Sequence, residues 1–172
     1  MQVLVALEAR FNSTPDGHVW SPGWAHYDFF RRYLDVFDEV RVIARVRAVD
    51  QPPTGARRAD GPGVSFASLP HYVGPWQFAR CYPALRRAVH LAVSPPAAVV
   101  LRVPGSIGTL VEMELRAAGR PFAVEVVGDP QEVFSPGGVR TRLRPLFRWW
   151  APRLLRQQCA GACATAYVTV RT

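Results

Sequence analysis

The segment Ala97–Val127 reads AAVVLRVPGSIGTLVEMELRAAGRPFAVEVV and carries the pattern that decides the fold. The apolar runs Ala97–Arg102 and Pro121–Val127 predict two strands, because near-continuous Val, Ala and Leu are typical of parallel strands covered on both faces. Ile107–Ala118 predicts a helix between them, with Gly119 as a left-handed C-terminal cap. A strand, a helix and a strand in this order predict a parallel pair joined by a right-handed crossover.

The same order extends over the rest of the chain, which is 172 residues long. It predicts one α/β domain over residues 1–172: a Rossmann-like, doubly wound, mostly parallel sheet of about six strands with helices on both faces. The further predicted strands are Gln2–Glu8, Glu39–Arg45, Val64–Leu69 and Ala164–Val170. The further predicted helices are Trp24–Phe37, a helix within Trp76–Val93 that begins near Tyr82 or Pro83, and Leu143–Gln158 with a kink or a break at Pro152.

The composition is globular, with 49% hydrophobic and 20% charged residues. No apolar run approaches the roughly 18 residues of a membrane-spanning helix, and the N-terminus reads as a first strand, so we expect a cytoplasmic protein. All 21 basic residues are Arg, and the net charge is +8. Codon bias explains this composition most simply, although Arg also suits phosphate and carboxylate groups. Three Cys without paired CxxC spacing exclude a zinc ribbon, and the sequence predicts neither a metal nor a cofactor.

Parallel α/β sheets bind ligands at the carboxyl ends of their strands, so we searched the loops that follow them. The loop after the first strand has neither a GxGxxG nor a GxxxxGK[ST] motif. Its Ser21-Pro-Gly23 sequence leads into a predicted helix, whose N–H groups could receive a phosphate or could simply be capped. Glu8 could bind a sugar hydroxyl or pair with Arg10. We therefore take Glu8, Arg10, Gly17, Ser21 and Gly23 as candidate substrate-binding residues.

Two further strand ends add candidates. Arg102, Gly105 and Ser106 lie where the fourth strand meets a helix, and there either an anion or polar ligand fits the helix N-terminus or Ser106 caps it. Asp129 follows the fifth strand and is the candidate catalytic residue, as a base or a sugar-hydroxyl ligand; the alternative is an Asx-type turn. Glu125 lies within that otherwise apolar strand and needs a partner, for which Arg102 is one candidate.

The stretch from residue 140 to 156 carries six Arg among aromatic and aliphatic residues and no acid. It suits a core helix with a solvated basic face. It also suits a helix lying on an anionic membrane through Arg144, Arg148, Trp149 and Arg153, or a nucleic-acid surface. A non-catalytic module that docks on membrane or nucleic acid through this helix is therefore the alternative function, and a membrane contact would place it at the inner face of the cell membrane.

Several segments in a fixed order resemble one known family. They are Val3–Asn12, Asp16-Gly17 with Trp20-Ser21, Arg32-Tyr-Leu34 with Phe37–Val40, Gly74-Pro-Trp76, Leu101–Pro104 with Gly108, Val124–Pro130 and Ala166–Thr169. Together they resemble the N-terminal domain of glycosyltransferase family 4-type enzymes of GT-B architecture, and the resemblance spans nearly the whole chain.

The resemblance implies a metal-independent enzyme of two Rossmann-like domains, of which the N-terminal one binds mainly the acceptor. It implies transfer of a sugar from a nucleotide-sugar donor to a glycan or lipid-linked acceptor, as in polysaccharide biosynthesis. On this basis the C-terminal donor-binding domain lies outside these residues, and we expect the chain alone to be inactive.

Overall fold

The computed structural model describes residues 1–127 and 144–168, with side chains of the last helix from residue 152 onward. Six parallel strands form the sheet in the order β5-β3-β1-β6-β7-β8. This confirms the Rossmann-like, doubly wound α/β fold. The parallel strands are β1 (Gln2–Ser13), β3 (Glu39–Ala48), β5 (Val64–Leu69), β6 (Ala98–Val103), β7 (Ala123–Val126) and β8 (Ala164–Tyr167).

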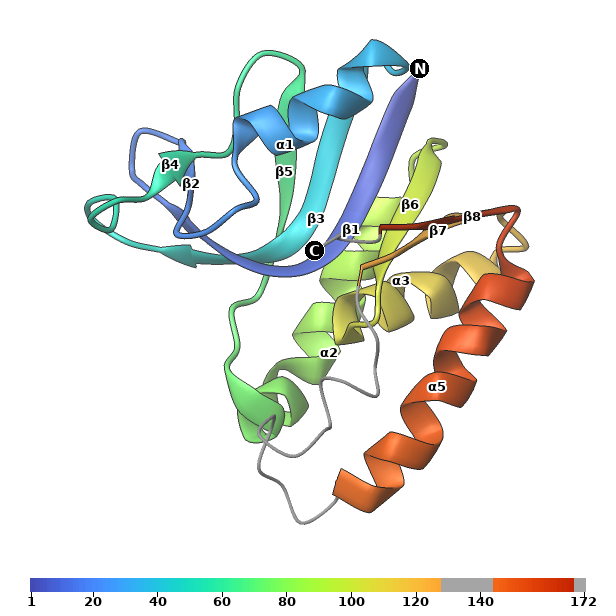
Figure 1. Cartoon of the computed structure of the whole chain (residues 1–172). Coiled ribbons are helices and arrows are strands. Elements are labelled where there is room, and N and C mark those ends of the chain that lie inside the picture. The colour runs from blue at the N-terminus through green and yellow to red at the C-terminus, as the bar shows by residue number, and fades with distance from the viewer. Residues whose placement is uncertain (128–143, 169–172) are drawn as a thin grey trace.

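Two short antiparallel strands, β2 (Val19–Ser21) and β4 (Arg57–Arg58), extend the sheet beside β1. The predicted ends of the first two parallel strands were wrong. β1 continues to Ser13 and β3 continues to Ala48, where the sequence predicted loops. The physical reason is Phe11, which is 1% exposed and packs edge-on against Phe66, so burial continues past the predicted strand end. The extended halves of β1 and β3 curve away together as a ribbon (Figure 1).

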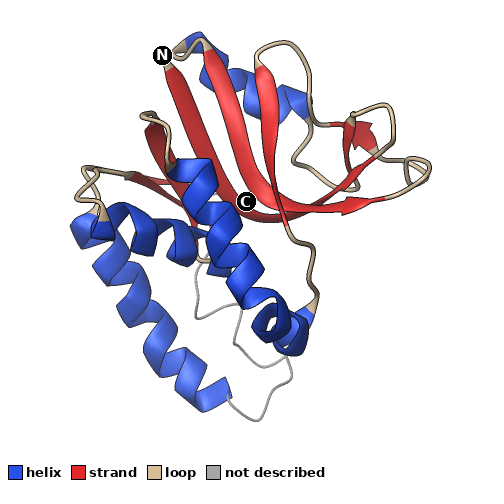
Figure 2. Cartoon of the chain, turned by 180° about the vertical axis from the view of Figure 1, so that it is seen from behind, coloured by secondary structure: helices blue, strands red, loops and turns tan. Residues whose placement is uncertain are grey.

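Each face of the sheet has its own core and its own helices. On one face lie the short helix α1 (Tyr27–Arg31) and the 3₁₀ turn η1 (Arg32–Asp35), which bury Phe30 against β1 and β3. On the other face lie α2 (Gly74–Val93), α3 (Ser106–Ala117) and α5 (Arg144–Gly161), as Figure 2 shows. Helices on both faces were predicted, and the structure confirms them. No helix among residues 1–127 and 144–168 has both the length and the apolar character to cross a bilayer.

The helix boundaries differ from the sequence prediction at several points. The predicted helix Trp24–Phe37 begins only at Tyr27 and tightens into η1, so Ser21 and Gly23 do not precede its first turn directly. Helix α2 begins at Gly74 and runs through Pro83, because Leu85 and Val89 beyond the proline are fully buried. Their burial outweighs the roughly 3 kcal/mol that proline costs inside a helix.

The last two helices follow the prediction closely. Helix α3 ends at Ala117, and Gly119 has a φ of +62°, as predicted for a left-handed cap. Helix α5 is a single helix that contains Pro152, so it is not broken into two.

Candidate functional site

The strand order reverses between β1 and β6, because the chain adds β3 and β5 on one side of β1 and then β6 on the other. Ligands of such sheets bind outside the carboxyl ends of the strands at this point. The last paired residues there are Ala6 and Leu101, and the β1–β3 register shifts between Ala6 and Arg10. Bulges of this kind re-aim side chains. Glu8 lies within the bulge and faces the first turn of α3.

The Glu8 carboxylate is the centre of a polar cluster. It accepts hydrogen bonds from the Ser106 hydroxyl at 3.0 and 3.1 Å, from the Tyr72 hydroxyl at 3.1 Å and from the backbone N–H of Ile107 at 2.9 Å. It also forms an ion pair of 2.9 Å with Arg45. Its side chain is 32% exposed, so a ligand can still reach it. We call Glu8, Arg45, Tyr72 and Ser106 the switch-point cluster.

Arg45 holds Glu8 and Tyr72 of the switch-point cluster in place. It is 8% exposed, lies 4.4 Å above the Tyr72 ring, and donates to the backbone carbonyls of Glu8 at 2.8 Å and Tyr72 at 3.1 Å. The alternative that Glu8 pairs with Arg10 was therefore wrong. Sequence reasoning missed both Arg45 and Tyr72, although Arg45 ends the predicted strand Glu39–Arg45 and Tyr72 lies in the loop after β5, at the same edge of the sheet.

Tyr72 and Ser106 present two hydroxyls next to the carboxylate, 2.5 Å from each other. Burial raises the pKa of Tyr72 to about 12, against which the Ser106 hydrogen bond acts in the opposite direction. The phenol therefore stays protonated at neutral pH and can donate. The protons of both hydroxyls already point to Glu8 or to the neighbouring hydroxyl. The cluster therefore offers a polyhydroxylated ligand mainly the remaining lone pairs of the carboxylate and hydroxyl oxygens as acceptors, and a hydroxyl can donate to the ligand when it releases Glu8.

The N-terminus of α3 is already engaged within the chain. The Ile107 N–H points to Glu8, and Ser106 bonds Glu8 instead of capping its own helix, whose N-cap residue is Gly105. A Cβ on Gly105 would lie 3.0 Å from both Cβ and Oε2 of Glu8. Gly105 therefore permits the close approach, and the favourable helix dipole acts on Glu8. The reading that Ser106 caps the helix was wrong.

A second polar group lies on the opposite face of the sheet, under α1. Arg102 and Glu125 are register partners on β6 and β7, and they form an ion pair of 3.2 Å, which confirms the predicted pairing. Glu125 also accepts from Arg32 at 3.1 and 3.2 Å and from the Tyr33 hydroxyl at 2.9 Å. We call Arg32, Tyr33, Arg102 and Glu125 the α1-face cluster.

Burial dominates the electrostatics of the α1-face cluster. It lowers the pKa of Arg102, partly offset by Glu125, and raises the pKa of Tyr33 to about 12. The Arg102 guanidinium stacks 4.4 Å from the Phe29 ring, and Trp24 covers it at 4.9 Å while staying 58% exposed. Residues alternate across a strand, so Arg102 faces away from Ser106. The structure thus separates the predicted candidates into two clusters.

The remaining candidates lie apart from both clusters. Gly17 occupies the β1–β2 hairpin turn with a φ of +83°, and Ser21 ends β2, where its hydroxyl contacts the backbone of Gly23. Arg10 is exposed on the curved half of β1. Asp129, the candidate catalytic residue, lies outside the described residues.

The basic helix α5 is described in its second half. Leu155 and Cys159 pack against the core, and buried Gln158 donates to Glu112 of α3 at 2.8 Å. This half matches the reading of a core helix, with Arg153 on its exposed side. The side chains of Arg144, Arg148 and Trp149 lie outside the described residues.

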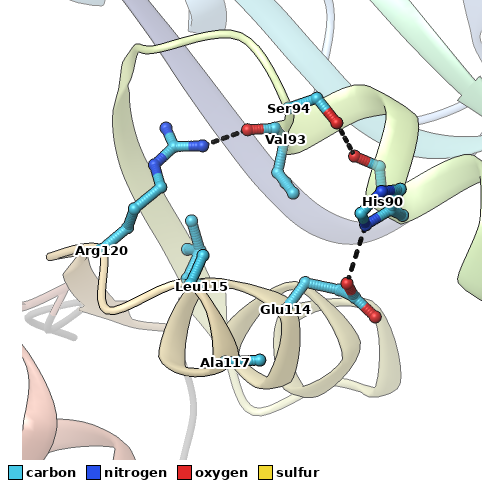
Figure 3. A pocket seen from close by; sticks show the side chains of 8 residues that line it. His90, Val93, Ser94, Glu114, Leu115, Ala117 and Arg120 are labelled. Carbon is cyan, nitrogen blue, oxygen red and sulfur yellow. Dashed lines mark hydrogen bonds and ion pairs between the residues drawn. The ribbon is translucent and has the colours of Figure 1, made fainter.

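A pocket of about 280 Å³ lies far from both clusters, at the amino ends of β6 and β7. Figure 3 shows it between α2 and α3, with His90 bonded to Glu114 at 3.1 Å. The Ser94 hydroxyl points to the backbone carbonyl of His90 and not to its ring. Arg120 donates to the carbonyl of Val93, so it satisfies the end of α2. The pocket lies between the C-terminal ends of α2 and α3, and its lining residues do not place a nucleophile next to a base.

Comparison with known proteins gives few matches. No protein-family model matches the chain. Protein CapJ from Staphylococcus aureus is 26% identical over 128 residues, which cover 74% of this chain and 32% of CapJ. Among solved structures, a ugt transferase from Siraitia grosvenorii in complex with UDP is similar at 16% identity and a TM-score of 0.41, over 77% of this chain and 29% of that one. The chain thus spans about a third of the length of these proteins.

Proposed function

We propose that the chain is the acceptor-binding, N-terminal part of a metal-independent, GT-B-type glycosyltransferase, which transfers a sugar from a nucleotide-sugar donor to a glycan or lipid-linked acceptor. The switch-point cluster is the observation that carries the proposal. It brings a carboxylate and two hydroxyls to the edge of the sheet where such folds bind ligands. The sequence resemblance to family 4-type enzymes agrees with this placement.

In the proposed reaction, the bond between the donor sugar C1 and its phosphate oxygen breaks, and a bond from C1 to an acceptor oxygen forms. The acceptor hydroxyl loses its proton to a base, for which Asp129 is the proposed residue. Glu8 accepts a hydrogen bond from an acceptor hydroxyl, while Tyr72 and Ser106 orient its neighbours. Positive groups of a C-terminal domain outside these residues stabilise the leaving diphosphate.

Glycan binding by the chain tests the acceptor role directly. We expect the wild-type chain to bind a subset of glycans on an array. The variants Glu8→Gln and Ser106→Ala should each weaken that binding about tenfold, since each loses or weakens one hydrogen bond to the glycan. The matched control is Glu114→Gln, at the opposite edge of the sheet. Failure of the folded wild type to bind any glycan, or equal binding by all four proteins, contradicts the proposal.

An activity assay tests separately whether the chain needs a donor-binding domain for sugar transfer. We expect the 172-residue chain to release no nucleotide diphosphate from UDP-glucose, UDP-N-acetylglucosamine or GDP-mannose in the presence of the glycans that it binds. Release by the isolated chain would show that it contains a complete active site.

A further inference from the structure

The curved half of the β1–β3 ribbon carries an exposed basic surface beyond the switch-point cluster. Arg10 is paired in register with Arg45, and Asn12 with Arg47, and all four lie on the face opposite to Phe11 and Val46. Figures 1 and 2 both show these two strand ends running side by side. Like charges directly across a strand pair destabilise the sheet, so their placement needs a reason.

Among residues 1–127 and 144–168, only Arg45 of these three Arg residues has a carboxylate partner. Glu8 compensates Arg45, whose side chain is buried. Arg10 and Arg47 are exposed, and within residues 1–127 and 144–168 neither forms an ion pair or a side-chain hydrogen bond. Codon bias accounts for the use of Arg in place of Lys, but it does not place uncompensated charges side by side on one face.

His71 completes this surface from the loop after β5. Burial lowers the pKa of His71, and Arg45, Arg47 and Arg10 lower it further. His71 follows Leu69, the register partner of Arg45. It adjoins Tyr72, whose backbone carbonyl accepts a hydrogen bond of 3.1 Å from Arg45. His71 therefore lies beside the carboxyl end of β3, which carries Arg45 and Arg47, and its neutral ring can donate one hydrogen bond.

We propose that Arg10, Arg47 and His71 form a binding site for a phosphate group. Strand spacing and rise place the Cα atoms of Arg10 and Arg47 about 8 Å apart on a diagonal, so their guanidinium groups can approach one oxyanion from two sides. Two uncompensated charges match a phosphate, which carries about −1.5 to −2 at neutral pH, whereas one guanidinium would suffice for a carboxylate. The site adjoins the switch-point cluster through Arg45, and it does not depend on sugar transfer.

Titration with inorganic phosphate, followed by backbone amide NMR, tests the site. We expect saturable shifts at Arg10, Arg47 and His71, and an affinity about tenfold weaker in the double variant Arg10→Gln/Arg47→Gln. The double variant Arg80→Gln/Arg87→Gln removes the same charge from exposed positions on α2 and should bind phosphate like the wild type. Shifts absent from the three residues, or equal weakening in both double variants, overturn the proposal.

Two further arms identify the source of the phosphate. Binding of glucose 1-phosphate with the same residue-specific shifts supports a soluble phosphorylated ligand. Binding to vesicles that contain phosphatidic acid, whose headgroup is a phosphomonoester, supports a lipid headgroup if inorganic phosphate displaces it. Vesicle binding that phosphate does not displace, together with no response to phosphate itself, shows a general membrane surface and overturns the site. The glycan array reports on Glu8 and Ser106 independently, so either proposal can fail alone.

Discussion

The ion pair between Arg102 and Glu125 gives the sharpest quantitative prediction. Its two side chains are only 6% and 15% exposed. Removal of Glu125 therefore leaves the Arg102 charge buried without its ion-pair partner, whereas Glu125 keeps Arg32 as a second partner when Arg102 is removed. Breaking such a pair costs about 3–5 kcal/mol, whereas replacing both partners by apolar residues of similar size is close to neutral. When Glu125 is removed, the Arg102 guanidinium still stacks on Phe29 and Trp24, and this stacking partly stabilises the remaining charge. We therefore expect Glu125→Leu to lower the free energy of unfolding by about 3 kcal/mol.

A double-mutant cycle measures this coupling. The single variants Glu125→Leu and Arg102→Met and the double variant are compared by urea unfolding, followed by circular dichroism. Arg102→Met leaves Glu125 paired with the exposed Arg32, so we expect it to cost about 1 kcal/mol. The double variant should lie within about 1 kcal/mol of the wild type, so the coupling energy, which is the sum of the two single losses minus the loss in the double variant, is about 3–4 kcal/mol. Additive single effects, or a loss below about 1 kcal/mol in Glu125→Leu, would refute the reasoning.

The structure provides a matched control for this cycle. The Glu114 side chain is 16% exposed, almost as buried as Glu125, but its partner Arg86 is 54% exposed. Water therefore solvates Arg86 when the carboxylate is removed. We expect Glu114→Leu to cost less than about 1 kcal/mol, and a cost equal to that of Glu125→Leu would show that burial of the cation is not the cause.

Three further predictions concern packing, ionisation and a helix. Gly105→Ala should lower the free energy of unfolding by about 1–3 kcal/mol, because the new Cβ would lie 3.0 Å from Glu8; an unchanged urea midpoint would show that the loop moves aside without cost. In the folded protein the pKa of Tyr33 and Tyr72 is raised from 10.0 to about 12, so the stability that the two phenols contribute is intact below pH 10 and is lost as the pH rises through about 12. A near-ultraviolet absorbance titration should therefore show a late phase that the two Tyr→Phe variants remove. Pro83→Ala should raise the free energy of unfolding by about 1–2 kcal/mol, since it restores a helical hydrogen bond and loses only a little rigidity in the unfolded chain; lower stability in urea would contradict this.

The sequence determined the six parallel strands and the presence of helices between them, although not all of their ends. Strands without charged interruptions, such as Val64–Leu69, and the helix closed by Gly119 follow from local periodicity and backbone preference, which tertiary contacts did not overrule. The pairing of Glu125 with Arg102 was also predictable, because an acid in an apolar strand needs a partner and the neighbouring strand carries one.

Only the tertiary structure decided how the polar residues assemble. Glu8 contacts Arg45, Tyr72 and Ser106 because a bulge in β1 turns its side chain toward α3. The residue pattern around Glu8 did not predict this bulge. The sequence likewise did not separate Arg102 from Glu8, since the face on which a strand-end residue emerges depends on the register of its neighbours. The spacing of apolar residues along the chain determines where helices and strands form. The partner of a charged side chain is determined by contacts between residues that lie far apart in the sequence.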